Sequence, residues 1–158
     1  MDRSANGDTA SMDVHARVDA PCAPSRLLDE VDDLARYPGW MDLVHRAVRL
    51  SAADTPTWDV ELRARVGPLA RSKRLRMERT VLDQAAGRVV FERREADGRR
   101  HSPWTLAAEI TASGSGSTLT MHLHYGGSLW TGGVLERVLA DQITNGRERL
   151  LQLIQPTH

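Results

Sequence analysis

An arginine interrupts a row of apolar side chains in the middle of the sequence. Leu75, Met77 and Val81 occupy alternating positions, and Arg79 falls on the same face of the predicted strand. A guanidinium group on an apolar face could hold a carboxylate, phosphate or enolate oxygen through two hydrogen bonds. Arg79 could instead lie at the end of the strand and reach solvent, or pair with Glu92 or Glu109. We therefore treat Arg79 as a candidate ligand-binding and catalytic residue with a structural alternative.

A tyrosine is the second candidate for chemistry. Tyr125 continues the apolar row formed by Leu119, Met121 and Leu123. Its hydroxyl group could donate a hydrogen bond to a bound carbonyl group or act as a general acid. The alternative is a tyrosine packed in the core with its hydroxyl group at the edge.

Histidine, cysteine and glycine patterns give little support to other chemistry. His122 and His124 share one face of a predicted strand, a spacing that can place two imidazoles on one metal ion. The face is outward and no third ligand stands at a recognisable offset, so we expect no metal. Cys22 lies in a turn with no paired base, which disfavours a thiol nucleophile. The glycine pairs lack the pattern of a phosphate-binding loop, and we expect no cofactor.

The strongest local charge bias lies between positions 63 and 79. Seven basic residues oppose the single acidic Glu78; they are Arg63, Arg65, Arg71, Lys73, Arg74, Arg76 and Arg79. Arg63, Arg65, Arg74 and Arg76 fall on outward faces of neighbouring strands. They could bind an acidic partner or RNA, or pair with acidic residues across the strands. The whole chain has 21 basic and 21 acidic residues, and this segment has almost no aromatic side chain for base stacking, so we disfavour nucleic acid as a partner.

Periodicity predicts the elements that position these residues. Alternation predicts a first strand from Met12, and leucines at helical spacing predict one or two short helices over 25–36. A weaker strand candidate spans 44–50, with Val44, Val48 and Leu50 on one face. Five further strands follow, separated by proline and glycine turns.

A change of period predicts one long amphipathic helix over 130–154. Its apolar stripe comprises Leu135, Val138, Leu139, Gln142, Ile143, Leu150, Leu153 and Ile154. Gly146 costs about 1 kcal/mol relative to alanine in a helix interior, so close packing or space for a ligand should compensate. An antiparallel sheet with one apolar face can bury that face by curling around this helix. We therefore predict an α+β fold with a curved sheet of about seven strands.

Length and composition bound the remaining possibilities. The chain has 158 residues, 41% hydrophobic and 27% charged, which suits one folded domain over 12–155 after a flexible tail over 1–11. The first 20 residues are polar, so we expect a protein that stays in the cytoplasm. No run of about 18 apolar residues is present, so we expect no membrane span.

The order of elements, with Tyr37-Pro38-Gly39-Trp40 after a short acidic helix, resembles the START-like (SRPBCC) superfamily. This helix-grip group includes polyketide cyclases/dehydrases and Bet v 1-like lipid binders. The resemblance covers residues 12–154, and its most specific parts are Val18-Asp-Ala-Pro, the 34–40 segment and the 135–151 helix. It implies a cavity between sheet and helix for a hydrophobic or amphipathic small molecule. Four tryptophans supply most of the aromatic surface, and Trp58 and Trp104 are the better candidates for the cavity wall.

Three functional hypotheses follow. The first is a carrier or sensor, monomer or dimer, that buries a lipid, polyketide or isoprenoid. The residues expected to bind it are Trp58, Leu62, Met77, Arg79, Trp104, Leu106, Met121, Leu123, Tyr125, Gln142, Ile143 and Gly146. The second is an enzyme resembling aromatase/cyclases, with Arg79 and Tyr125 as catalytic residues. The third is a protein-interaction module that uses the basic outer face.

Overall fold

The computed structural model describes residues 11–51, 53–66, 68–126 and 134–155, with the backbone alone at 66, 69 and 134–139. Its elements are β1 (Ser11–Ala20), α2 (Pro24–Val31), the 3₁₀ helix η1 (Leu34–Gly39), β2 (Val44–Arg49), β3 (Thr57–Val66), β4 (Leu69–Asp83), β5 (Arg88–Arg93), β6 (Trp104–Ser113), β7 (Gly116–Gly126) and α3 (Val134–Ile154). This is the predicted order of elements. The predicted tail lies outside the described residues, except that Ser11 already belongs to β1.

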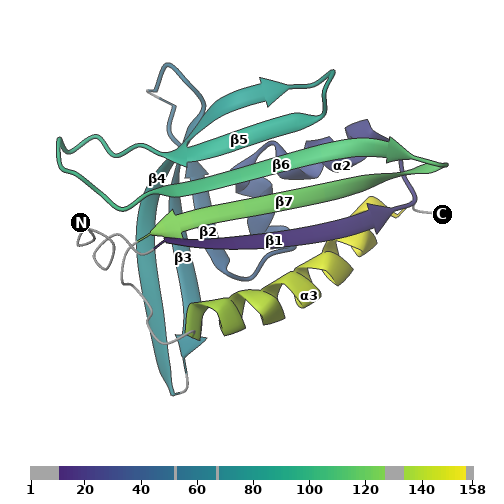
Figure 1. The fold of residues 1–158 in the computed structure, drawn as a ribbon. Helices are drawn as coiled ribbons and strands as arrows, with labels where there is room; N and C mark the ends of the chain where they lie inside the picture. Colours follow the sequence, from purple (N-terminus) through teal and green to yellow (C-terminus); the bar gives the residue numbers. More distant parts are fainter. Residues whose placement is uncertain (1–10, 52, 67, 127–133, 156–158) are drawn as a thin grey trace, which may run out of the picture.

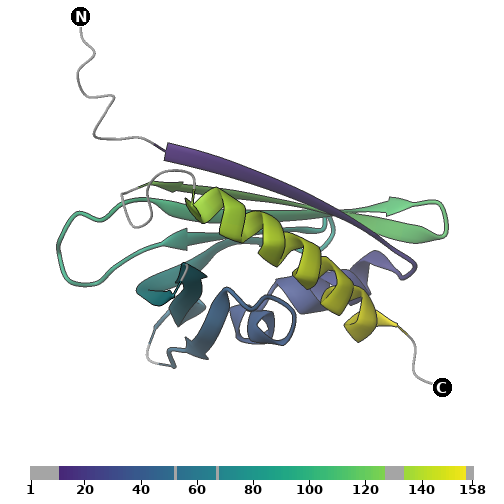
Figure 2. The same ribbon diagram turned by 90° about the horizontal axis from the view of Figure 1, so that it is seen from below.

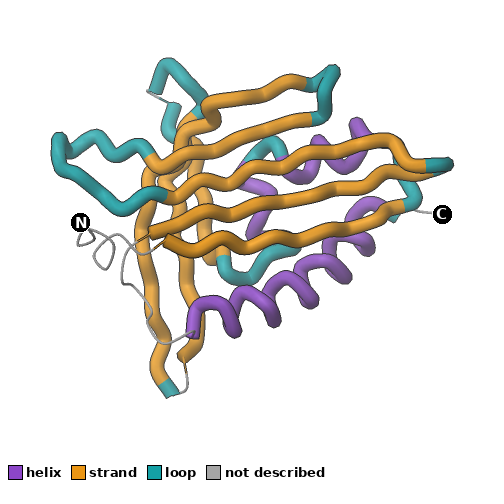
Figure 3. Tube along the Cα trace, viewed as in Figure 1, coloured by secondary structure: helices purple, strands orange, loops and turns teal. Residues whose placement is uncertain are grey.

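The strands form one antiparallel sheet in the order β1-β7-β6-β5-β4-β3-β2. β4 is 15 residues long; its first part pairs with β3 and its last part with β5. The sheet curves strongly at this strand (Figure 1). α2, η1 and α3 all lie on one face of the sheet (Figures 2 and 3). The predicted α+β helix-grip architecture is therefore confirmed.

Apolar side chains cover the concave face, on the side of the helices. Val60 of β3 stands opposite Leu75 of β4, and Leu106 of β6 stands opposite Leu123 of β7. Opposed residues of an antiparallel pair point to the same face, so each pair adds to one apolar surface. The predicted inward faces of β3, β6 and β7 are confirmed by this register and by the burial of their apolar residues.

Two β-bulges correct the predicted faces of β2 and β4. The register shifts between Val44 and Arg46, and again between Arg79 and Val81. A bulge adds one residue to one strand and reverses the alternation beyond it. Val48 is therefore 41% exposed and Val81 is 37% exposed. The prediction that Val48 shares a face with Val44, and Val81 with Met77, is therefore wrong.

α3 begins at Val134, and residues 130–133 of the predicted helix lie outside the described residues. Leu150 and Ile154 are buried, as their place in the apolar stripe predicts. Leu153 is 43% exposed, because it lies about 100° around the helix from Ile154. The prediction for Leu153 is therefore wrong. None of the helices within the described ranges is long and apolar enough to cross a membrane.

Candidate ligand-binding site

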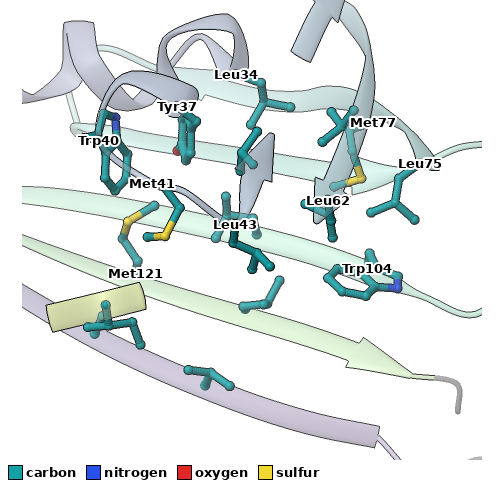
Figure 4. Close-up of a pocket in the computed structure, with 17 residues that line it drawn as sticks. Leu34, Tyr37, Trp40, Met41, Leu43, Leu62, Leu75, Met77, Trp104 and Met121 are labelled. Atoms are coloured by element: carbon teal, nitrogen blue, oxygen red, sulfur yellow. The ribbon is translucent and has the colours of Figure 1, made fainter. Parts of the chain in front are cut away.

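A cavity of about 130 Å³ lies between the concave face of the sheet, the η1 turn and α3. Its wall consists of apolar side chains (Figure 4). An engineered protein cavity of about 150 Å³ with a similar apolar wall binds benzene. The space therefore suits a single ring or a short alkyl chain.

Seven of the twelve residues predicted to bind a ligand line this cavity. They are Leu62, Met77, Trp104, Leu106, Met121, Leu123 and Ile143. All seven come from strands or the long helix, where the period of the sequence gives the direction of each side chain. Their contact with a ligand remains a prediction.

Ten further residues complete the lining, none of which was predicted as a ligand contact. They are Val14, Ala16, Leu34, Tyr37, Trp40, Met41, Leu43, Val44, Val60 and Leu75. Five of these lie in η1 and the turn that follows it. A turn has no period from which side-chain direction could be predicted. The aromatic segment at 37–40 is the sequence feature that could have drawn attention to them.

The Asp33 carboxylate fixes the η1 turn in place. Its Oδ1 accepts a hydrogen bond from the backbone N–H of Ala35 at 2.9 Å and from the indole N–H of Trp58 at 3.1 Å. Trp58 is fully buried and packs edge-on against Phe91. Trp58 was predicted as part of the wall, but it is not among the lining residues. Its hydrogen bond to Asp33 instead holds η1 against β3.

Arg79 also lies outside the lining. Its Nη1 donates to the backbone oxygen of Asp32 at 2.7 Å, and its guanidinium carbon lies 5.8 Å from the centre of the Trp58 ring. Arg49 lies over the same ring at 5.3 Å. Both a carbonyl oxygen and an aromatic face stabilise a cation. Arg79 thus has a structural partner, the backbone oxygen of Asp32, which the stated alternatives of solvent or an acidic side chain did not include.

Two other candidates pack just behind the wall. Tyr125 is 4% exposed, and its ring stacks on Trp104 with 5.1 Å between ring centres. Gln142 accepts a hydrogen bond at Oε1 from the backbone N–H of Leu43 at 2.7 Å. Gln142 thus ties α3 to the turn before β2. Neither residue lines the cavity.

Gly146 lies outside the lining as well, at a close approach between α3 and the turn after η1. A Cβ atom at this position would lie 2.9 Å from the backbone oxygen of Trp40. Of the two reasons considered for a glycine here, close packing is the one that this contact supports.

Among the lining residues that the structure describes, Tyr37 has the single titratable side chain. Its hydroxyl group donates to the backbone oxygen of Val31 at 2.9 Å, and the residue is 2% exposed. Burial, followed by the negative charges of Asp32 and Asp33, raises the pKa of Tyr37 well above its ordinary value. Tyr37 therefore stays neutral, and its hydroxyl proton is engaged in the hydrogen bond to Val31.

Two indole groups of the wall bury a donor without an acceptor. Trp40 Nε1 and Trp104 Nε1 have no hydrogen-bond partner in the part of the chain that the structure describes. An unpaired buried donor costs about 1 to 3 kcal/mol. The wall is therefore apolar in character, with two unsatisfied N–H groups embedded in it.

A second, smaller cavity of about 30 Å³ adjoins the first on the side of Arg147 and Leu150. Both cavities are lined by Ala16, Trp40, Met41, Met121 and Ile143. Met41 and Met121 lie side by side in Figure 4. Both methionines therefore belong to the walls of both cavities, and methionine is a flexible side chain that adapts to the space around it.

The outer face of β1 and β7 carries the two histidines considered as metal ligands. His122 Nε2 and His124 Nδ1 lie 2.6 Å and 3.0 Å from Asp13 Oδ1. These contacts lower the pKa of Asp13. The His15 ring stacks on that of His122 at 4.3 Å. Among the described residues no group of three or more such side chains is placed to hold a metal ion.

The basic outer face of β3 and β4 has partners within the sheet. Arg74 forms an ion pair with Asp59 at 2.8 Å, and Arg76 Nη1 donates to the backbone oxygen of Arg94 at 2.9 Å. Arg63 Nε lies 3.4 Å from Ser72 Oγ. Cross-strand pairing, the alternative to a docking surface, thus accounts for much of this charge.

Comparison with known proteins places the fold. No protein-family model and no curated protein matches the sequence. The structure is similar to the Zhui aromatase/cyclase from a Streptomyces species, with a TM-score of 0.65 at 12% identity over 92% of this chain and 94% of that chain. A START superfamily protein from Mycobacterium smegmatis has a TM-score of 0.62 at 14% identity, over 90% and 96% of the two chains. Norcoclaurine synthase from Thalictrum flavum has a TM-score of 0.61 at 9% identity, over 98% of this chain and 92% of that chain.

The fold is START-like. The resemblance stated from the sequence is therefore confirmed at the level of architecture. In this START-like chain the sheet curves around α3, and η1 supplies the turn that completes the cavity wall. At such low identities the similarity concerns the fold, so the function must be argued from the cavity itself.

Proposed function

We propose that this START-like protein binds a hydrophobic or amphipathic small molecule in the cavity between sheet and α3, as a carrier or sensor. One observation carries the proposal: a space of about 130 Å³ whose seventeen lining residues present apolar surface. Burial of apolar ligand surface contributes about 25 cal/mol per Å² before the costs of association. The driving force for binding is therefore the removal of the ligand from water.

The composition of the wall favours binding over catalysis. General acid–base chemistry needs a titratable group within hydrogen-bond reach of the reacting atom. Tyr37 is the one such group among the described lining residues, and its hydroxyl already donates a hydrogen bond to the backbone oxygen of Val31. Arg79 and Tyr125, the two candidate catalytic residues, lie outside the lining. The carrier or sensor hypothesis is thus the one that we retain.

The experiment compares binding of 1-hexanol by the protein and by two alanine-to-leucine variants, using isothermal titration calorimetry. Ala16 lines the cavity, so Ala16→Leu fills part of the space. Ala107 lies on the outer face of β6, opposite His122, and Ala107→Leu adds the same bulk outside the cavity. We expect Ala16→Leu to weaken binding at least tenfold, and Ala107→Leu to leave it unchanged.

Native mass spectrometry of the purified protein adds an independent test. A released apolar molecule of defined mass would identify the ligand class directly. Failure of hexanol to bind the unsubstituted protein, or equal binding by Ala16→Leu, would contradict the proposal. Circular dichroism of each variant ensures that a lost fold is not mistaken for a filled cavity.

A further inference from the structure

Two cations flank the cavity lining along β4. Leu75 and Met77 line the cavity, and the next inward positions on either side of them are Lys73 and Arg79. The register sets Lys73 directly opposite Leu62 of β3, which also lines the cavity. Opposed residues share a face of the sheet. The Lys73 side chain therefore projects from the concave face next to Leu62 and Leu75 of the cavity lining.

The two flanking cations differ in their partners. Arg79 is bonded to the backbone oxygen of Asp32 and lies over the Trp58 ring. Lys73 is half-buried, yet within the described ranges it has neither an ion pair nor a side-chain hydrogen bond. Partial burial of a charged group that makes no hydrogen bond is unfavourable. Lys73 is the only lysine in the chain.

The acidic group near Lys73 is already engaged. Glu95 Oε2 accepts a hydrogen bond from Arg93 Nε at 2.7 Å and from the backbone N–H of Arg76 at 3.1 Å. Arg93 stands opposite Met77, on the concave face, and its side chain is 8% exposed. It adds a second positive charge near Lys73. Partial burial, and then the charge of Arg93, lowers the pKa of Lys73, while Glu95 opposes this change.

We propose that Lys73 binds the anionic end of the ligand, and that the ligand is a small amphipathic carboxylic acid whose apolar part fills the cavity. This inference rests on the proposed function. The ammonium group offers three donors, and its hydrogen bonds to a carboxylate are charge-assisted and short. The apolar wall contacts the alkyl chain of the ligand, and the Lys73 ammonium group binds its carboxylate. The site should therefore bind carboxylic acids more tightly than alcohols of equal length.

Calorimetry with hexanoate and 1-hexanol at neutral pH separates head from tail. Lys73→Met keeps the length of the side chain and removes its charge. Arg74→Met removes one charge at the adjacent position, on the outer face, where Arg74 is exposed and paired with Asp59. We expect Lys73→Met to bind hexanoate about tenfold to a hundredfold more weakly than the unsubstituted protein. Its affinity for hexanol should be unchanged. Arg74→Met should bind both ligands normally.

The single lysine permits a direct spectroscopic test. A sample labelled with ¹³C-lysine gives one side-chain Cε signal, whose pH titration reports on Lys73 alone. Hexanoate should raise the midpoint of that titration, because an anion beside the amine favours its charged form. Hexanol should leave the midpoint unchanged or lower it. The lysine signal thus distinguishes direct contact from an effect on folding.

Each outcome bears on one proposal or the other. Equal binding of hexanoate by the protein and by Lys73→Met, with hexanol still bound, overturns the role of Lys73 and leaves the apolar cavity site standing. Binding of neither ligand by the unsubstituted protein overturns the proposed function itself. A hexanoate-dependent shift of the lysine titration together with the selective loss in Lys73→Met supports both.

Discussion

Gly146 of α3 faces the backbone oxygen of Trp40 so closely that a Cβ atom would lie 2.9 Å from it and 3.1 Å from Met41 Cε. Both contacts belong to the turn after η1, which supplies part of the cavity wall. The methionine could move aside, but the backbone oxygen is held by the fold. The distance between α3 and this turn is therefore set by the absence of a side chain at one position.

Gly146→Ala should destabilise the protein, although alanine favours a helix by about 1 kcal/mol over glycine. The clash with a backbone atom costs about 1 to 3 kcal/mol and displaces the turn. Urea unfolding measures the difference. Glu148→Ala, at an exposed position of the same helix, should lie within about 0.5 kcal/mol of the parent. A Gly146→Ala protein more stable than its parent would refute the close approach.

Truncation of either methionine shared by the two cavities should allow the site to accept a longer ligand. Met41→Ala and Met121→Ala each remove a side chain shared by the two cavities. We expect each to cost about 2 to 5 kcal/mol of stability, and to shift the tightest binder in a series from hexanol to decanol toward longer chains. Calorimetry across the series gives the optimum. An unchanged optimum in both variants would mean that the cavities do not join.

Arg79→Met should reduce stability without weakening hexanoate binding. The substitution leaves the backbone oxygen of Asp32 without its donor and removes a cation from the Trp58 ring. The loss of a charged hydrogen bond costs about 1.5 to 3 kcal/mol. Thermal unfolding and calorimetry on one sample measure both effects. A selective loss of hexanoate affinity would instead return Arg79 to the ligand site and displace Lys73 from it.

The alkaline stability of the protein should depend on Tyr37. The unfolded chain releases this proton near the ordinary pKa of 10.0, whereas burial raises the pKa in the folded state. The folded protein then holds more protons than the unfolded chain, so the free energy of unfolding falls as the pH rises above 10. Unfolding in urea across this pH range measures the slope.

Tyr37→Phe is the control for this pH dependence. It should cost about 1 to 2 kcal/mol at neutral pH, because the backbone oxygen of Val31 loses its donor. It should also show a shallower decline above pH 10, since one titrating group is gone. Identical slopes in the two proteins would assign the alkaline loss to other groups.

Local pattern predicts the strands well, because a strand repeats every two residues. Leu75 and Met77 follow that repeat and face the cavity. The bulge before Val81 cannot be read from the repeat, since it depends on the pairing of β4 with β5. Lys73 stands in phase with Leu75 and Met77, and this alternation is the sequence feature that places it beside the cavity. Because Lys73 lies within a run of basic residues, it is easily interpreted as part of the charged outer face.

The wall contributed by η1 depends on contacts between distant residues. Trp40 and Met41 face the cavity because Asp33 bonds to Trp58 of β3, 25 residues away, and because Gln142 of α3 holds Leu43. No window of the sequence contains both partners of either contact. The contact of Arg79 is equally hard to predict. Its partner is the backbone oxygen of Asp32, and every residue type has a backbone oxygen.

The two indole groups without a hydrogen-bond partner among the described residues allow ligand binding to be followed by tryptophan fluorescence. Trp40 and Trp104 lie in the cavity wall without a hydrogen bond to the described residues, so their fluorescence should be blue-shifted in the empty protein. A ligand that brings an oxygen atom to either N–H group would move that emission to longer wavelength, whereas a purely apolar ligand would leave its colour unchanged. Occupancy of the cavity and the polarity of its occupant could then be followed in real time without a label.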